Sequence, residues 1–125
     1  ETCEFAKQRK VMGKSISSYQ VISFPLVEAE TQLEAARLLC YKTLWLRDQE
    51  MPNSKEGGMC KWWVPELTYE IVRQCLTIHG HYGYSDELPF EQRLRDILGW
   101  QIGDGTSQVS KLIVARSMFG KGFSG

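Results

Sequence analysis

Apolar side chains recur at helical intervals along most of this chain, most clearly in residues 19–48. They are Leu26, Val27, Leu33, Ala35, Ala36, Leu38, Leu39, Leu44 and Trp45. This spacing predicts one long amphipathic helix. An interior proline removes a backbone hydrogen bond and clashes with the preceding turn. Because Pro25 lies inside the pattern, the sequence predicts either a kink there or a regular helix that starts near it.

A second long helix is predicted for residues 55–79. Residues 51–54 (MPNS) interrupt the first pattern, and Ser54 can cap the helix that follows. Gly80 can end that helix, because glycine readily adopts the backbone conformation found just beyond a helix terminus. Pro65 predicts a kink within it.

Shorter segments complete the expected fold. Residues 2–11 form an opening helix, residues 80–85 a loop, residues 88–96 a short helix with a proline in its first turn, and residues 101–105 a second loop. Thr106 then caps a final helix that Gly120 ends. Four main helices, one short helix and brief connections predict an all-α, up-and-down four-helix bundle without strands.

The charge balance narrows the choice of partners. Fifteen basic and fifteen acidic residues cancel, and no basic block or membrane-length apolar run occurs, so we expect neither nucleic acid nor a membrane as a partner. Cys3, Cys40, Cys60 and Cys75 are widely spaced, which predicts four free thiols in helices and no metal centre.

The first residues lack both an initiator methionine and a helix-capping residue. A helical pattern that starts without a cap is typical of a chain that begins within a helix. We therefore expect residues 1–125 to form a single domain of a longer protein.

Arg9, His81 and Asp104 are the side chains that invite a functional interpretation, and each also has a structural one. Arg9 stands in a cationic cluster that suits a helix carboxyl end, or it grips a phosphate. His79 and His81 flank a glycine, as metal ligands or as parts of a tight turn. Asp104 lies between two glycines, where it can cap the next helix or act as an accessible general base.

Five segments, taken in order, resemble the acyl-CoA dehydrogenase family. They are RKVMGKSI at 9–16 with YQ at 19–20, EAARLL at 34–39 with Trp45, KEGGMCK at 55–61, IHGHYGY at 78–84, and RD at 95–96 with DGT at 104–106. The family reads R-K-x-F-G-K-P-I, E-A-A-R-L-L, K-E-A-A-M-A-K, I-H-G-G-x-G-Y, and R-D with E-G-T. The resemblance covers nearly the whole chain, and the order and spacing of the set make it specific.

The resemblance implies a flavoprotein with an amino-terminal helical domain, a middle β-domain and a carboxy-terminal four-helix bundle, and this chain resembles the third part. Such enzymes use FAD to oxidise acyl-CoA thioesters, pass electrons to an electron-transfer flavoprotein or a similar acceptor, and assemble as homo-tetramers. The implied location is the cytoplasm in a bacterium or the mitochondrial matrix in a eukaryote. The isolated domain is expected to be inactive.

Site residues are carried over position by position. Asp104 aligns with the catalytic glutamate that removes the α-proton, and Gly105 with a position that contacts substrate. The positions that resemble FAD contacts are Arg9, Gln20, Gly80, Gly83, Thr106 and Gln108. In the family, Arg9 and the two glycines approach the flavin of a neighbouring subunit.

Met12 and Ser15 stand where the family has phenylalanine and proline, and three further departures bear on the site. Aspartate is shorter than glutamate by about 1.5 Å, so the backbone or the substrate must close the distance at Asp104. Gly103 removes bulk beside it, which predicts a branched, cyclic or aryl-substituted acyl group. His81 places a side chain where the family prefers glycine.

Two other functions compete with a dehydrogenase that uses Asp104. Relatives that oxidise nitroalkanes also carry aspartate at this position and pass electrons from the flavin to oxygen. A catalytically silent subunit could keep the bundle for assembly alone.

Overall fold

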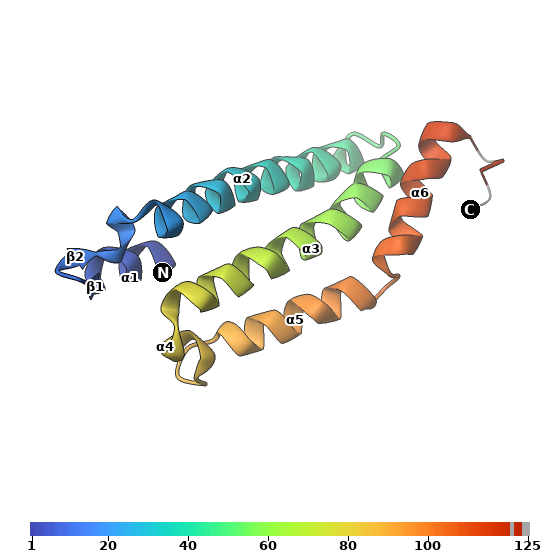
Figure 1. Cartoon of the computed structure of the whole chain (residues 1–125). Helices are drawn as coiled ribbons and strands as arrows, with labels where there is room; N and C mark the ends of the chain where they lie inside the picture. The colour runs from blue at the N-terminus through green and yellow to red at the C-terminus, as the bar shows by residue number, and fades with distance from the viewer. Residues whose placement is uncertain (121, 124–125) are drawn as a thin grey trace.

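The computed structural model describes residues 1–120 and 122–123, and within them it is helical apart from one small hairpin (Figure 1). The helices are α1 (Thr2–Gln8), α2 (Gln20–Asp48), α3 (Ser54–His79), α4 (His81–Tyr84), α5 (Phe90–Ile102) and α6 (Ser107–Phe119), with a 3-10 turn, η1, at Ile16–Ser18. The predicted all-α class is confirmed.

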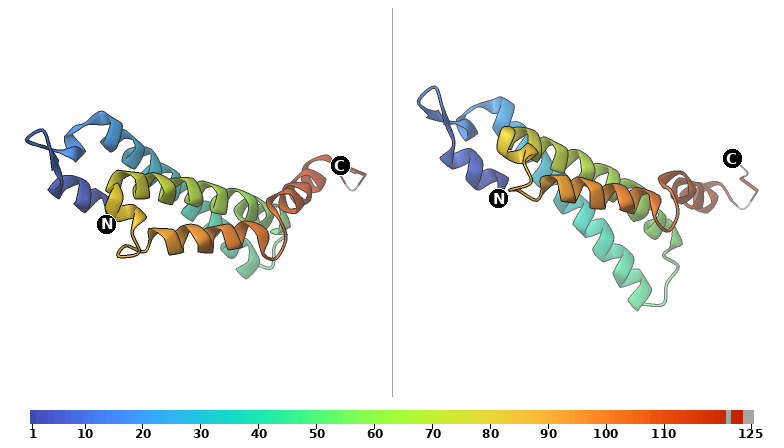
Figure 2. Two further views of the ribbon diagram at one scale, coloured as in Figure 1. Left: turned by 60° about the horizontal axis from the view of Figure 1, so that its bottom comes forward. Right: turned by 90° about the horizontal axis from the view of Figure 1, so that it is seen from below.

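Helix α3 lies at the centre of the bundle. Helices α2, α5 and α6 each pack on it, and α2, α3 and α5 run alternately up and down (Figures 1 and 2). Helix α6 crosses α3 near its beginning, where a Cβ at the buried Gly58 would lie 3.0 Å from the backbone oxygen of Ser110. The small residue therefore permits this close crossing.

Both long helices continue through their prolines. Helix α2 begins at Gln20 and includes Pro25, so the alternative in which it starts near the proline is wrong. Helix α3 likewise includes Pro65. Asn53, not Ser54, is the amino-terminal cap of α3, whereas Gly80 ends it with a φ of 63°, as expected.

The opening segment differs from its prediction, because α1 ends at Gln8 and a two-stranded antiparallel hairpin follows. Strand β1 (Lys10–Val11) pairs with β2 (Lys14–Ser15) around Met12 and Gly13. Both turn residues have positive φ, 50° and 78°, which is the geometry of a tight hairpin turn. The opening helix predicted for residues 2–11 is therefore too long, and Gly13 is part of a turn.

The carboxy-terminal half contains more helix than expected. Residues 81–84 form one helical turn, α4, and α5 continues to Ile102 rather than ending near Asp96. Ile97 and Trp100, beyond the predicted end, line a cavity with α3 residues. This packing extends α5 past the limit that local pattern suggested. Thr106 caps α6 and Gly120 ends it, as predicted.

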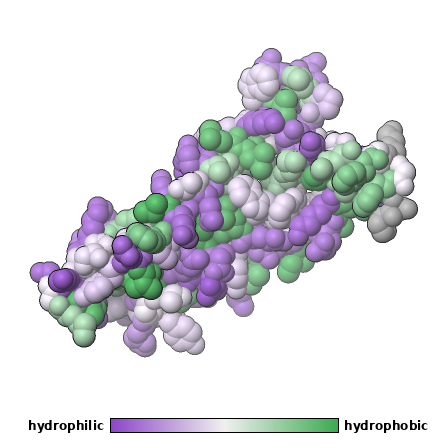
Figure 3. Space-filling view, turned by 45° about the horizontal axis from the view of Figure 1, so that its top comes forward, coloured by the Kyte–Doolittle hydropathy of each residue, from purple (hydrophilic) through white to green (hydrophobic). Residues whose placement is uncertain are grey.

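The buried core is small and the apolar surface is large. Ala6, Ile71 and Phe90 are among the buried side chains, whereas Val27, Leu38 and other apolar residues of α2 are more than half exposed. Apolar patches are visible in Figure 3 between hydrophilic regions. None of the described helices is both long and apolar enough to span a bilayer.

Candidate functional site

The loop between α5 and α6 holds Asp104 in a conformation that few residues adopt. Asp104 has a φ of 53° and Gly105 a φ of 102°. Two successive left-handed residues turn the chain sharply, and aspartate tolerates this region better than most residues because its short side chain is polar. The side chain is exposed, so the turn presents a carboxylate to its surroundings.

The two ends of this loop are anchored. On the α5 side, the N–H of Gly103 donates to the carbonyl oxygen of Gly99 at 2.8 Å. On the α6 side, the Thr106 hydroxyl accepts from the N–H of Val109 at 3.4 Å. The strained turn is therefore short and fixed at both flanks. Gln108 lies exposed in the first turn of α6.

A cavity of about 440 Å³ opens beside the loop. Its lining consists of Arg95, Asp96, Gly99, Trp100, Gly103 and Asp104. Gly99 and Gly103 belong to the lining, a Cβ at Gly99 would meet nothing within 4 Å, and the Trp100 indole, 64% exposed, forms an apolar wall. The arrangement can place an organic substrate against a carboxylate base.

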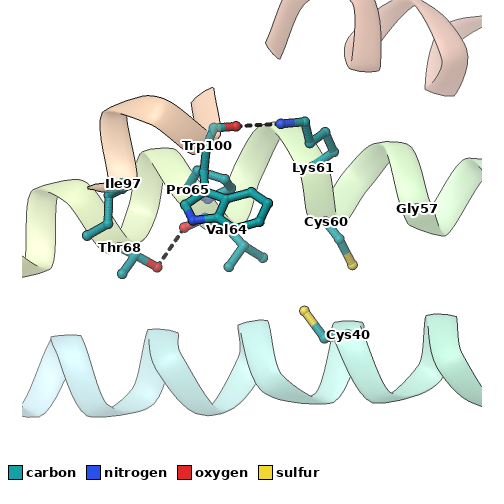
Figure 4. Close-up of a pocket in the computed structure, with 9 residues that line it drawn as sticks. All are labelled: Cys40, Gly57, Cys60, Lys61, Val64, Pro65, Thr68, Ile97 and Trp100. Atoms are coloured by element: carbon teal, nitrogen blue, oxygen red, sulfur yellow. Dashed lines mark hydrogen bonds between the residues drawn. The ribbon is translucent and has the colours of Figure 1, made fainter. Parts of the chain in front are cut away.

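Lys61, on α3, contacts the same loop. Its ammonium donates to the carbonyl oxygen of Gly103 at 2.6 Å and also to that of Trp100. Figure 4 shows the bond to Trp100. A cation at a helix carboxyl end compensates carbonyls that lack partners within the helix. No sequence pattern predicted this contact, because Lys61 lies some 40 residues from its acceptors along the chain.

A second group of predicted site residues lies at the other end of α3. Arg9 and Gly80 line a cavity of about 380 Å³ together with His81. The polar side chains of its lining are Arg9, His79, His81 and Tyr82, and no carboxylate is among them. This donor set suits an anion, such as a phosphate. Gln20, the first residue of α2, is exposed and is not part of the lining.

His79 has a structural role. It is buried between the rings of Phe5 and Phe90, with centroids 4.2 and 4.6 Å away, and its Nδ1 lies 2.8 Å from the Cys75 carbonyl oxygen. Among the described residues, no group of three or more histidine, cysteine or acidic side chains is placed to hold a metal ion.

Gly83 serves packing within the domain. A Cβ there would lie 2.3 Å from the Leu76 carbonyl oxygen and 2.9 Å from the Cβ of His79. The glycine lets α4 press against the end of α3, so its position has an explanation that needs no cofactor. Gly80 differs, because a Cβ there would meet nothing within 4 Å.

The two groups are widely separated. Lys61, at the Asp104 loop, precedes His79, at the Arg9 cavity, by 18 residues of one helix. At 1.5 Å per residue this is about 27 Å. Figure 1 shows the hairpin, α1 and α4 at one end of the molecule and the α5–α6 loop toward the other. The two groups therefore cannot contact the same functional group of a ligand.

A third cavity, of about 460 Å³, lies between α2, α3 and α5 (Figure 4). Cys40 and Cys60 face it from opposite helices, and both are free thiols, as are Cys3 and Cys75. Burial and the neighbouring Cys60 raise the pKa of the Cys40 thiol. The sequence did not predict this apolar groove.

Residues 1–119 match the family model described as acyl-CoA dehydrogenase, C-terminal domain. The chain is 37% identical to a probable acyl-CoA dehydrogenase, YngJ, of Bacillus subtilis, over 91% of this chain and 30% of that protein. It is also 37% identical to the caffeyl-CoA reductase-Etf complex subunit CarC of Acetobacterium woodii, over 97% of this chain and 32% of that protein.

The fold matches that of butyryl-CoA dehydrogenase from Megasphaera elsdenii, with a TM-score of 0.90 and 31% identity over 94% of this chain and 30% of that one. The chain thus spans about 30% of the length of the relatives that it matches.

Proposed function

The chain belongs to the acyl-CoA dehydrogenase family of flavoprotein oxidoreductases, and on that premise we propose that it is the carboxy-terminal helical domain of a longer FAD-dependent enzyme. This parent enzyme oxidises the α,β-bond of an acyl-CoA thioester, or reduces the corresponding double bond. The observation that carries the proposal is the Asp104 carboxylate, exposed on a left-handed turn beside a cavity.

Asp104 acts as the base in this proposal. The thioester carbonyl acidifies the α-carbon, so a positioned carboxylate can take the proton: the C–H bond breaks, an O–H bond forms on Asp104, and the electron pair becomes the new double bond. FAD, when bound, accepts the β-hydrogen as hydride. In the reductive direction Asp104 returns the proton to the α-carbon. Gly105, which follows the base in the chain, is the proposed substrate contact.

The Arg9 cavity fits the diphosphate of FAD. Its lining offers a guanidinium and an imidazole without a carboxylate, and arginine binds phosphate oxygens in pairs. Because this cavity is about 27 Å from the Asp104 loop along α3, the two groups serve different parts of the cofactor or different cofactor molecules. A homo-tetramer in which Arg9 and Gly80 reach a neighbour's flavin accommodates this separation. Thr106, Gln108 and Gln20 complete the proposed flavin contacts.

The acyl group is proposed to be bulky, with an aryl substituent favoured. Gly99 adds no side chain to the lining, where a Cβ would meet nothing within 4 Å, and Trp100 offers an aromatic wall beside Asp104. The similarity to a caffeyl-CoA reductase-Etf complex subunit supports both this substrate class and an electron-transfer flavoprotein as the redox partner.

The test is anaerobic reduction of the flavin in the parent enzyme, followed by absorbance, with straight-chain, branched and aryl-substituted acyl-CoAs. We expect the wild-type flavin to be reduced fastest by an aryl-substituted substrate. Asp104→Asn removes the base without changing the size of the side chain, so the reduction rate should fall by roughly 10²–10⁴-fold.

Asp48→Asn, at an exposed aspartate in the last turn of α2, is the matched control and should keep the wild-type rate. A fully active Asp104→Asn enzyme would refute the role of Asp104. Oxygen consumption with a nitroalkane would favour a nitroalkane-oxidising flavoenzyme instead. A parent protein that binds no flavin would favour a catalytically silent subunit.

A further inference from the structure

Lys61 lies where it can control the direction in which Asp104 points. Its ammonium donates to the carbonyl oxygens of Gly103 and Trp100. The Gly103 oxygen belongs to the same planar peptide unit as the N–H of Asp104. A hydrogen bond to that oxygen therefore limits rotation of the peptide unit that leads into Asp104, and with it the positions that the carboxylate can reach.

The turn needs such a constraint. Asp104 has a φ of 53°, a region that non-glycine residues occupy only when their surroundings hold them there. Glycines on both sides allow many alternative conformations. The Thr106 cap restrains the side toward α6, but it lies after the turn. On the side that enters the turn, the Gly103 N–H is held by the Gly99 carbonyl oxygen, and Lys61 adds a restraint on the Gly103 carbonyl oxygen from α3, the central helix of the bundle.

We propose that Lys61 is a positioning residue for proton abstraction, which rests on the proposed function of Asp104. It does not touch substrate in this proposal. It holds the peptide before Asp104 so that the shorter carboxylate reaches the α-carbon. Because a misplacement of about 1 Å can lower a rate about a hundredfold, the loss of these two hydrogen bonds should act on the chemical step more than on binding.

The experiment compares Lys61→Met and Lys61→Arg with wild type in the parent enzyme loaded with FAD. The readouts are the first-order rate constant of flavin reduction at saturating substrate, the substrate dissociation constant and the flavin content. We expect Lys61→Met to lower the rate constant by roughly 10- to 100-fold, with the other two values within about twofold of wild type. Lys61→Arg, which keeps donors for two carbonyls, should restore most of the rate.

Lys111→Met is the matched control. Lys111 also contacts α3, with its ammonium 3.7 Å from Glu66 and 4.6 Å from the centre of the Trp62 ring, but it makes no contact with the loop carbonyls. Its substitution should leave the reduction rate unchanged. If Lys61→Met does not hold flavin, the rate constant is measured instead on the flavin-loaded fraction of Lys61→Gln. A rate constant at least fivefold below that of wild type supports the positioning role.

A wild-type rate constant in Lys61→Met or Lys61→Gln would overturn the inference, as would a loss explained wholly by weaker flavin or substrate binding. The Asp104→Asn variant distinguishes an error in the role of Lys61 from an error in the proposed function. If Asp104→Asn abolishes reduction while the Lys61 variants do not, only the positioning role is wrong. If Asp104→Asn remains active, the base itself is wrong.

Discussion

Individual glycines in this chain have different tasks, and the sequence alone does not separate them. Gly80 and Gly83 stand in one motif, yet a Cβ would be free of contacts at Gly80 and would collide with the backbone of α3 at Gly83. Gly57 and Gly58 are neighbours in α3, but only Gly58 lies against α6. What a glycine does is decided by the element packed on it.

Gly83→Ala should therefore destabilise the domain, and Gly57→Ala should stabilise it. The first adds a methyl 2.3 Å from the Leu76 carbonyl oxygen, and such overpacking costs roughly 1–3 kcal/mol. The second replaces a helical glycine where a Cβ meets nothing within 4 Å, which gains about 0.5–1 kcal/mol. Thermal unfolding followed by circular dichroism measures both. Equal melting temperatures for the two variants would show that α4 does not pack on α3 as described.

The candidate site was predictable from sequence only in part. Asp104 and the Thr106 cap follow from turn and capping residues next to a helical pattern, and Thr106 was confirmed as the cap of α6. Lys61 and Trp100 could not be found in this way, because their roles arise from contacts between α3 and α5. Pairs distant in sequence leave no periodic signal.

At the scale of elements, helix existence was predicted better than helix ends. The pattern identified α2, α3 and α6 within one residue or two, since long amphipathic runs have a strong period. The hairpin after α1 and the last two turns of α5 were missed. The first miss is local, because Met12 and Gly13 form a tight turn between adjacent strands. The second has a nonlocal cause, the packing of α5 on α3.

An ion pair between Glu1 and Arg93 connects the start of α1 to α5, and its contribution to stability depends on pH. A hydrogen bond from Arg93, at 2.9 Å, is the main cause that lowers the pKa of Glu1, and the charge of Arg93 adds to it. Because the pKa of Glu1 is lower in the folded state, the ion pair stabilises the fold above the usual glutamate pKa. This stabilisation is lost as the pH falls through the folded-state pKa. Both side chains are almost half exposed, so the pair contributes at most about 1 kcal/mol.

Glu1→Gln should thus lower the melting temperature slightly at pH 7, and the difference from wild type should shrink as the pH falls below 4. Melting curves between pH 3 and 7 measure this, with Glu87→Gln, on the loop before α5, as the control. A difference that stays constant across that range would contradict the ion pair as its source.

The whole molecule exposes more apolar surface than a free-standing domain of this size is expected to carry. One stripe follows α2 at three- and four-residue intervals, with a polar interruption in its middle. It consists of Phe24, Val27, Leu38, Tyr41 and Trp45, each more than half exposed. The opposite side of the helix supplies Ala29, Ala36 and Leu46 to the core. Sequence periodicity located the apolar residues of α2 but could not show that half of them face outward.

We expect this stripe to be covered in the assembled parent enzyme. Leu38→Glu together with Tyr41→Glu should shift the protein to smaller species in sedimentation velocity while leaving the helical content unchanged, because exposed substitutions rarely alter folding by more than about 0.5 kcal/mol. Gln32→Glu, exposed on the same helix, is the control. Assemblies of unchanged size in the double variant would mean that another surface holds the subunits together.

The distance between the Arg9 cavity and the Asp104 loop has a genetic consequence. If each chain supplies its base to one flavin and its phosphate-binding end to another, a defect in one chain is not confined to one active site. In a cell that carries two alleles, a subunit damaged at Arg9 and a subunit damaged at Asp104 can combine so that one flavin site in the mixed enzyme is intact. The same sharing lets one defective allele impair the product of a normal one.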